Sequence, residues 1–592
     1  MLASATMRRR SFLLTAAAGA GSAAAAQNKP IRPAAVENAT PGESPAIVLS
    51  QVGFLPDAKK RVIYRMASGE VPPESFTLRD IGAPVKPFSL TRPLVQAPGD
   101  VPNCLMGDFS GLTREGFYQI TAGDERCAPF FIRADAWRRT LPKAIGYHHA
   151  QRCGVGVPNV HPACHLDDAR RRDTGEHVDV TGGWHDAGDL RKWMSATMMA
   201  GFGILRIARH LGERWDLAGS GLGVLLDEMR WGNRYFLKMQ NRDGRVWADT
   251  AGGVNGDNSD NHWTDNRIGT ADDRYINTAK PAQVQAMFVA LQAMVAQAFA
   301  QADPSYAKSC LAAGVRCWEA TEHPKSTRDL SWRLLAAIEL HRATHDARHA
   351  AEAAKLGDAL AALQVSDYIG SQKKVRGFWG TGGAKPVPYW DAVYSALPPI
   401  AMLELAAALP VQANARRWRD SVSLYIDEYA APMAARSAYG VVPLGLFPGS
   451  PTPETYRPLE GELTYRYFMP TRQRSWWLGI TSHLESHAVL LAAAAHAFNK
   501  PAYRDLAFRQ LEWVVGNNPF GACLMTGEGW RNSYPYSRFV GPIAGGIVNG
   551  IAGNAQDVPI LQMEYGNDWR TGEYWTPHVA FYEWALAQLE AA

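Results

Sequence analysis

The residue types best suited to chemistry lie in one short stretch, Val178-Asp-Val-Thr-Gly-Gly-Trp-His-Asp-Ala-Gly-Asp-Leu190, in which Asp186 and Asp189 stand three residues apart among three glycines. Glycines permit a tight turn, and neighbouring acids resist ionising together, which is how proteins tune a general base. A lone pair of acids at this spacing usually marks a solvated turn. Because Trp184 and His185 directly precede the pair, we expect a lined active site.

A distant carboxyl is the best candidate for a proton donor. Glu573 is followed by Tyr574 and Trp575, whose rings would desolvate the carboxyl and raise its pKa, as a general acid requires. It also precedes the last predicted helix, where an ionised Glu573 would merely favour the helix N-terminus. Inverting cleavage between two sugars needs carboxyls about 6.5–9.5 Å apart, so one turn could not supply both.

Two cysteines and two histidines precede the acid pair in sequence: Cys153, Cys164, His165 and His185. Two thiolates and two imidazoles are the usual closed ligand set of structural zinc. Such a site would clamp the acid-bearing loop to the first helix of the domain and leave no coordination position for water. The spacing is not that of a zinc finger, and a Cys153–Cys164 disulfide beside two unrelated histidines is an equal alternative.

Two further groups of residues each have two interpretations, and two cysteines are candidates for a disulfide. Asp257-Asn-Ser-Asp-Asn261 with Asp265, Asp272 and Asp273 could bind calcium or form a solvated acidic loop. Trp379 and Trp390 could stack on sugar rings or pack at a helix start. Cys104 and Cys127 could pair in an oxidising compartment.

Length and composition limit the class of protein. A chain of 592 residues exceeds one ordinary domain, and 46% hydrophobic residues supply a sizeable core. The net charge is only +4 and no basic run follows the N-terminus, so we exclude a nucleic-acid partner. We expect a monomer.

The N-terminal sequence is typical of an export signal. Residues 1–26 contain Arg8-Arg-Arg-Ser-Phe-Leu-Leu14 and end in Ala24-Ala-Ala26, the pattern of a twin-arginine signal peptide with a small-residue cleavage site. The apolar run from Ser11 to Ala26 is too short to span a bilayer, so we expect a periplasmic or secreted protein without a membrane anchor. Residues 27–43 read as a linker.

The remaining chain divides into two patterns. Residues 44–134 carry short β-type runs at the spacing of a small β-sandwich (46–50, 61–65, 75–78, 116–120 and 129–132). From 135 to 592 the apolar periodicity is helical, which predicts a mainly α domain. Its helices are expected at 137–150, 192–211, 221–240, 281–301, 304–319, 328–344, 348–366, 389–410, 413–432, 477–498, 502–516 and 577–591. Twelve helices suit a barrel of six helical hairpins, with the long loops as its functional rim.

Several blocks in the same order resemble glycoside hydrolase family 9. The blocks are Gln151-Arg-Cys-Gly154, Cys164-His-Leu-Asp-Asp168, Gly182-Gly-Trp-His-Asp-Ala-Gly-Asp189, Gly516-Asn-Asn-Pro-Phe520 and Thr526-Gly527, while Gln51-Val-Gly-Phe-Leu-Pro56 resembles the immunoglobulin-like domain that precedes many bacterial members. The resemblance implies an (α/α)6 barrel and inverting cleavage of β-1,4-glucans. It implies Asp189 as general base, Asp186 as its partner in holding water and Glu573 as general acid. It also favours zinc over the disulfide.

Two departures from the family pattern concern the substrate. Tyr536 stands where typical members have a substrate-binding histidine, although Arg538 is kept, and Gly572 replaces the asparagine that usually precedes the acid. Hydrogen bonding to a glucosyl hydroxyl must therefore differ. An exo-acting β-glucosidase or glucosaminidase is one alternative to an endo-β-1,4-glucanase, and a non-catalytic carbohydrate-binding protein is another.

Overall fold

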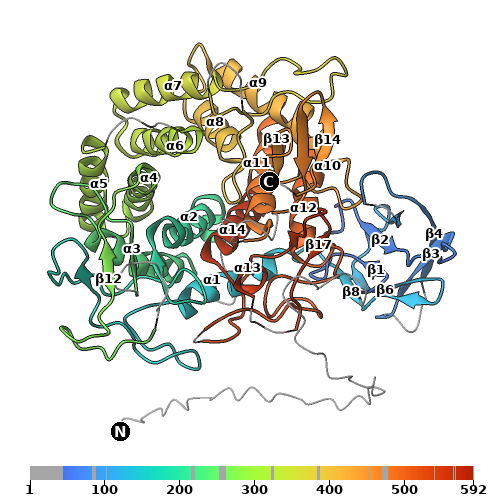
Figure 1. Ribbon diagram of the computed structural model, residues 1–592, viewed down its shortest axis with the longest axis horizontal. Coiled ribbons are helices and arrows are strands. Elements are labelled where there is room, and N and C mark those ends of the chain that lie inside the picture. The colour runs from blue at the N-terminus through green and yellow to red at the C-terminus, as the bar shows by residue number, and fades with distance from the viewer. Residues whose placement is uncertain are drawn as a thin grey trace, which may run out of the picture.

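The computed structural model describes residues 44–590, except 83–87, 102, 215–220, 253–261, 322–323, 325, 383–386, 452–453, 470–477, 539, 565 and 567. The predicted signal peptide, the linker and the acidic run 257–261 lie outside these residues. Figure 1 shows a ring of helices with a smaller β domain at one side.

The β domain is an antiparallel β-sandwich, as predicted. Its strands are β1 (Ile47–Val48), β2 (Arg61–Arg65), β3 (Ser75–Asp80), β4 (Ser89–Gln96), β5 (Cys104–Asp108), β6 (Gly116–Ala122), β7 (Glu125–Arg126) and β8 (Phe130–Ile132). They pair in the order β1-β2-β5-β4-β3-β6-β7, with β8 also on β6. The sequence pattern missed β4, which is mostly exposed and lacks apolar alternation, and the short β5.

Gln51 is one of the residues that connect the β domain to the barrel. The backbone N–H of Gln51 donates to Val515 O at 2.8 Å, its side-chain Nε2 donates to Gly521 O at 2.7 Å, and its Oε1 accepts from Trp530 N at 2.9 Å. Gly516 permits this approach, because a Cβ there would lie 2.5 Å from Gln51 Cγ. The block that resembled an N-terminal domain thus forms the domain junction.

Six largely buried helices form the inner ring of the barrel in the described part of the chain: α2 (Met194–Leu211), α4 (Ala282–Phe299), α6 (Thr327–Thr344), α8 (Leu397–Ala408), α11 (Thr481–Phe498) and α14 (Thr576–Glu590). Each packs on the next, and α14 packs on α2 to close the ring. Within the described residues, α4 alone is long and apolar enough to cross a membrane, and it is mostly buried in this core.

An outer layer of amphipathic helices covers the ring: α1 (Leu141–Ala150), α3 (Gly221–Lys238), α5 (Pro304–Glu319), α7 (Ala347–Ala361), α9 (Ala415–Tyr425) and α12 (Pro501–Val514). All twelve predicted helices are present. The predicted helix at 389–410 begins only at Leu397, because Pro398 and Pro399 fit the first turn of a helix and not its interior. Two short helices, α10 (Ala431–Ala434) and α13 (Trp569–Gly572), were not predicted.

The long loops carry small sheets on the rim. One consists of β9 (Arg170–Arg171), β10 (Lys192–Trp193), β11 (Asp249–Ala251) and β12 (Tyr275–Asn277), in the order β10-β11-β12-β9. The others are formed by β13 (Gly445–Pro448), β14 (Arg457–Glu460) and β15 (Leu463–Arg466), and by β16 (Ala552–Gly553) with β17 (Pro559–Ile560).

One core carboxyl makes stability sensitive to pH. Glu485 on α11 is fully buried, and neither of its oxygens has a hydrogen-bond partner among the residues that the structure describes. Burial raises its pKa well above 4.5. Its contribution to stability is complete below pH 4.5 and is lost as pH rises toward the folded pKa, by about 1.4 kcal/mol per pH unit.

Replacing Glu485 with glutamine should remove this loss, because the amide does not ionise. We expect the melting temperature of Glu485→Gln to match wild type in mild acid and to exceed it increasingly at higher pH. Thermal scans across pH test this. Glu352→Gln on α7, which replaces a carboxylate 3.8 Å from Lys355 Nζ, should show no such trend, and parallel curves for Glu485→Gln and wild type would refute the assignment.

Candidate active site

The predicted acid pair lies on a rigid turn. Both oxygens of Asp186 are engaged: Oδ1 accepts from Trp193 N at 2.8 Å and Oδ2 accepts from Trp575 Nε1 at 2.9 Å. Asp189 Oδ1 accepts from Arg191 N at 3.1 Å. Between the acids, a Cβ on Gly188 would lie 2.6 Å from the carbonyl oxygen of Tyr536, so glycine allows the 535–538 segment to pack on the turn.

Burial separates the roles of the two acids. Asp186 is 2% exposed, and this burial, followed by the negative charge of Asp189, raises its pKa to about 8. Asp189 is only partly buried and lines the neighbouring cavity. Asp186 is thus held in place by two donors, whereas Asp189 lies at the edge of the cavity.

The final loop brings Glu573 to the same place. Ala187 forms a β-bridge with Trp575, and Thr576 N donates to Asp186 O at 2.8 Å. Glu573 Oε1 is inaccessible to solvent and has no hydrogen-bond partner in the described part of the chain. Burial, then the charges of Asp189 and Asp186, raise the pKa of Glu573 well above 4.5. A carboxyl whose pKa is raised in this way is suited to general acid catalysis.

A cavity of about 390 Å³ joins these groups. Five predicted residues line it together: Asp186, Asp189, Glu573, Tyr536 and Arg538. Tyr536 forms a β-bridge with Glu573, and Arg538 N donates to Gly188 O at 3.0 Å. Tyr536 and Arg538 therefore lie in the same cavity as the three carboxyls.

Two predicted aromatic residues are not among those that line this cavity. Trp379 is 2% exposed, its Nε1 donates to Leu360 O at 2.9 Å, and its ring packs on Tyr425. The packing interpretation holds for Trp379, and the prediction that it binds substrate was wrong. Trp390 is 39% exposed and lies against Phe447, so a stacking role for it stays a prediction.

The sequence reading missed several lining residues, namely Arg191, Trp193, Asn549 and Trp569. Trp193 and Trp575 place their ring centroids 6.4 Å apart, and the 40% exposed Trp569 offers an open ring. Arg191 pairs with Asp249 and lies over the Trp193 ring. Adjacency to the acid pair was the available signal for Arg191 and Trp193, while sequence gave no signal for Asn549.

The predicted Cys/His set forms one buried group, comprising Cys153, Cys164, His165 and His185. Cys153 Sγ lies 3.6 Å from His165 Nδ1, Cys164 Sγ lies 3.7 Å from His185 Nε2, and the two nitrogens are 3.4 Å apart. Tetrahedral zinc bonds require edges of about 3.5 Å between S and N and about 3.3 Å between N and N. The four side chains therefore form a group that could hold a metal ion.

The surroundings of this group also suit a cation. Burial opposes ionisation of Cys153, but the hydrogen bond from Cys164 and the charge of Lys192 outweigh it and hold the pKa of Cys153 well below its usual value. His165 Nε2 lies 3.0 Å from His262 O, the kind of outer contact that orients a ligating imidazole. All seven cysteines lie in the described part and are free thiols, so neither the Cys153–Cys164 nor the Cys104–Cys127 disulfide is formed.

The acidic residues that were expected to form one possible calcium site come together only in part. Asp265 and Asp272 come together with Asp167, each offering an oxygen within 4.8 Å of the others. Asp273, which was predicted to belong to this group, instead pairs with Arg170 at 2.7 Å. Calcium at the three carboxylates stays a prediction.

Comparison with protein families gives two matches. The model described as "Glycosyl hydrolase family 9" matches residues 137–540, and "Cellulase N-terminal ig-like domain" matches residues 42–126. Among solved structures, a metagenome-derived glycoside hydrolase family 9 endoglucanase superposes with a TM-score of 0.70 at 22% identity, covering 92% of this chain and 99% of that one.

The curated relatives match over a smaller share of both chains. A cellodextrinase of Butyrivibrio fibrisolvens is 28% identical over 34% of this chain and 39% of its own length. Endoglucanase C of Cellulomonas fimi is 27% identical over 48% of this chain and 29% of its own length. The matched region thus spans less than half of each of these relatives.

Proposed function

Because the chain belongs to glycosyl hydrolase family 9, we propose that it is an inverting endo-β-1,4-glucanase. The observation that carries this proposal is the cavity that Asp186, Asp189 and Glu573 line together. Its lining also includes Trp193, Trp569 and Trp575, and tryptophan rings suit the apolar faces of sugars.

The proposed mechanism assigns each carboxyl one role. Asp189 removes a proton from the attacking water, which Asp186 also helps to hold. Glu573, protonated because burial raises its pKa, donates its proton to the leaving oxygen from the other side of the bond. The base and acid act on opposite faces of the sugar, so the anomeric configuration is inverted.

Digestion of defined cello-oligosaccharides, with products followed over time by chromatography and NMR, tests this function. An inverting endoglucanase should release internal fragments whose new ends are first α-configured. Release of single glucose units, or of glucosamine from chitosan oligomers, would instead favour an exo-acting enzyme; a cellodextrinase among the relatives makes short substrates the second candidate. Binding of soluble glucan without new reducing ends would contradict catalysis.

We further propose that the Cys/His group holds zinc. The distances between its donor atoms support tetrahedral coordination, and the soft thiolates favour zinc over hard cations. With four protein ligands the metal would leave no coordination position for water, so its part is to fix the chain around His185, which directly precedes Asp186.

Removing one of the four metal ligands should therefore lower the stability of the fold more than it lowers the rate of catalysis. Metal analysis of wild type should give about one zinc per chain, whereas Cys164→Ser should lose metal and melt at a lower temperature. Cys317→Ser, which alters a buried thiol on α5, controls for the loss of a core sulfur. Metal-free wild type, or full zinc content in Cys164→Ser, would contradict the site.

Two proposals concern the state of the protein in the cell. We propose export by the twin-arginine route, supported by Arg8-Arg-Arg-Ser-Phe-Leu-Leu14, and action as a monomer. Because that route carries folded proteins, the metal would be bound before export.

A further inference from the structure

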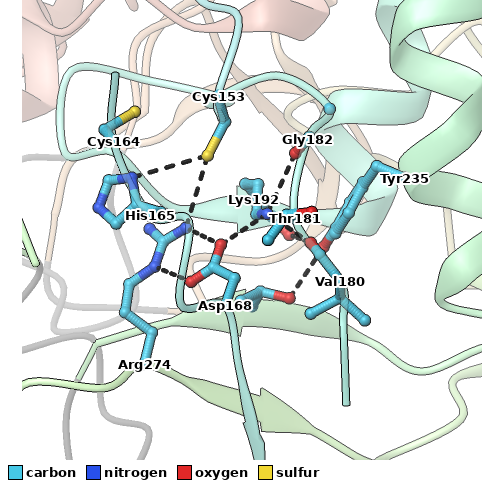
Figure 2. Close-up of polar contacts among 12 residues, drawn as sticks. Cys153, Cys164, His165, Asp168, Val180, Thr181, Gly182, Lys192, Tyr235 and Arg274 are labelled. Atoms are coloured by element: carbon cyan, nitrogen blue, oxygen red, sulfur yellow. Dashed lines mark hydrogen bonds and ion pairs between the residues drawn. The ribbon is translucent and has the colours of Figure 1, made fainter. Parts of the chain in front are cut away.

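A buried cluster of three charged residues lies beside the catalytic turn. Asp168, Lys192 and Arg274 are each 0% exposed and come from three segments of one rim sheet: Asp168 before β9, Lys192 in β10 and Arg274 before β12. Figure 2 shows the Asp168 carboxyl held between the guanidinium of Arg274 and the ammonium of Lys192.

The carboxyl of Asp168 is the common acceptor. Arg274 donates to it through two nitrogens, Nε to Oδ1 at 2.8 Å and Nη2 to Oδ2 at 2.6 Å, and Lys192 Nζ lies 2.7 Å from Oδ2. The charges of Arg274 and Lys192 outweigh burial and hold the pKa of Asp168 near 2. Since burying ions is costly, one cation would suffice if neutralising Asp168 were the only purpose.

Both cations also donate to the segment that carries the catalytic acids. Lys192 Nζ donates to Val180 O at 2.9 Å and to Gly182 O at 3.1 Å, before the turn. Arg274 Nη1 donates to Leu190 O at 2.6 Å, just after it. The cluster therefore fixes both ends of the segment against one carboxylate.

The contact with Leu190 bears most directly on the base. Leu190 has φ +65°, a left-handed conformation that a branched side chain rarely adopts, and it directly follows Asp189. A hydrogen bond from Arg274 to its carbonyl oxygen stabilises this conformation and so fixes the direction of the Asp189 side chain.

We propose that Arg274, anchored by Asp168 and aided by Lys192, is a positioning residue that holds Asp189 at the angle needed for water activation. The expected effect of Arg274 on catalysis depends on the proposed glucanase function. The expected effect of Arg274 on the conformation of the turn does not. Arg274 Nη2 also lies 3.9 Å from Cys153 Sγ, so the cluster links the Cys/His group to the acid turn.

The main test replaces Arg274 with lysine, which keeps the charge beside Asp168 but cannot reach both Asp168 and Leu190 O. A misplacement of about 1 Å can cost about 10²-fold in rate, so we expect kcat on soluble β-1,4-glucan to fall by up to that factor while KM changes little. Amide hydrogen exchange within 186–193 should quicken, and the metal content should stay at the wild-type level. Arg170→Lys, on β9 and paired with Asp273, is the matched control and should behave as wild type.

A second variant tests the same contact by rescue. Arg274→Ala should lose more activity, and added guanidinium at millimolar concentration should restore part of kcat, which a general loss of stability would not allow. Wild-type kcat and exchange in folded Arg274→Lys would overturn the proposal. If wild type cleaves no β-1,4-glucan, the proposed function fails, and the exchange of 186–193 alone then decides whether Arg274 positions the turn.

Discussion

Replacing Asp189 with alanine should lower kcat on a β-1,4-glucan by about 10²- to 10⁴-fold, the contribution of a positioned general base. Asp189 is partly exposed, and its carboxyl faces a cavity and not the core. The free energy of unfolding should therefore change little. Initial rates and thermal scans of the same preparation measure both quantities.

The control for Asp189→Ala is Asp179→Ala. Asp179 lies in the same stretch, but its side chain is 64% exposed and pairs with Lys238, so the variant should keep wild-type kcat. An Asp189→Ala enzyme that retains its turnover would remove Asp189 from the mechanism.

Glu573→Gln should show a loss that depends on the leaving group. The amide keeps the size of the side chain but cannot donate a proton as an acid, so kcat on unactivated glucan should fall by about 10²- to 10⁴-fold. On an aryl β-cellobioside with a dinitrophenolate leaving group, which departs without protonation, the variant should stay near wild type. Parallel kinetics on both substrates measure the contrast.

The pH profile supplies a second signature of Glu573. Wild-type kcat should fall as pH rises through the raised pKa of Glu573, because the acid form is lost, and Glu573→Gln should lack this alkaline limb. Glu564→Gln, an exposed acid in the same loop, is the control. Equal losses on both substrates would show that Glu573 is not the proton donor.

Local patterns predicted most of the architecture. The twelve helices follow from apolar spacing, since each buries a continuous stripe or is buried all round. Strand β4 was not predicted, because its Ser89–Gln96 sequence is largely exposed and carries a proline. Two adjacent prolines moved the start of α8 to Leu397, a covalent constraint that outweighs periodicity.

The candidate site was predictable where its residues are close together in sequence, and not where they come together only in the fold. Asp186, Asp189 and the Cys/His set share one region of sequence. Their types indicated an acid pair and a possible metal site, while the choice of zinc over a disulfide and the roles of the acids came from the resemblance to the family. Arg274 gave no such signal, because its importance lies in a contact with Asp168 106 residues away. Trp379 was misread because an aromatic residue beside a long loop looks the same whether it faces a cleft or the core.

The closure of the inner ring by α14 on α2 brings the two ends of the helical domain together at the proposed site. The bond from Trp575 Nε1 to Asp186 Oδ2 joins residues 389 positions apart, and Glu573 lies two residues before Trp575. A nascent chain that ends before Glu573 therefore contains the proposed base but lacks the proposed acid. A circular permutant that joins residue 590 to residue 135 and opens the chain between α7 and α8 would place the two catalytic segments close together in sequence, on either side of the new junction, so that the site would form from local contacts.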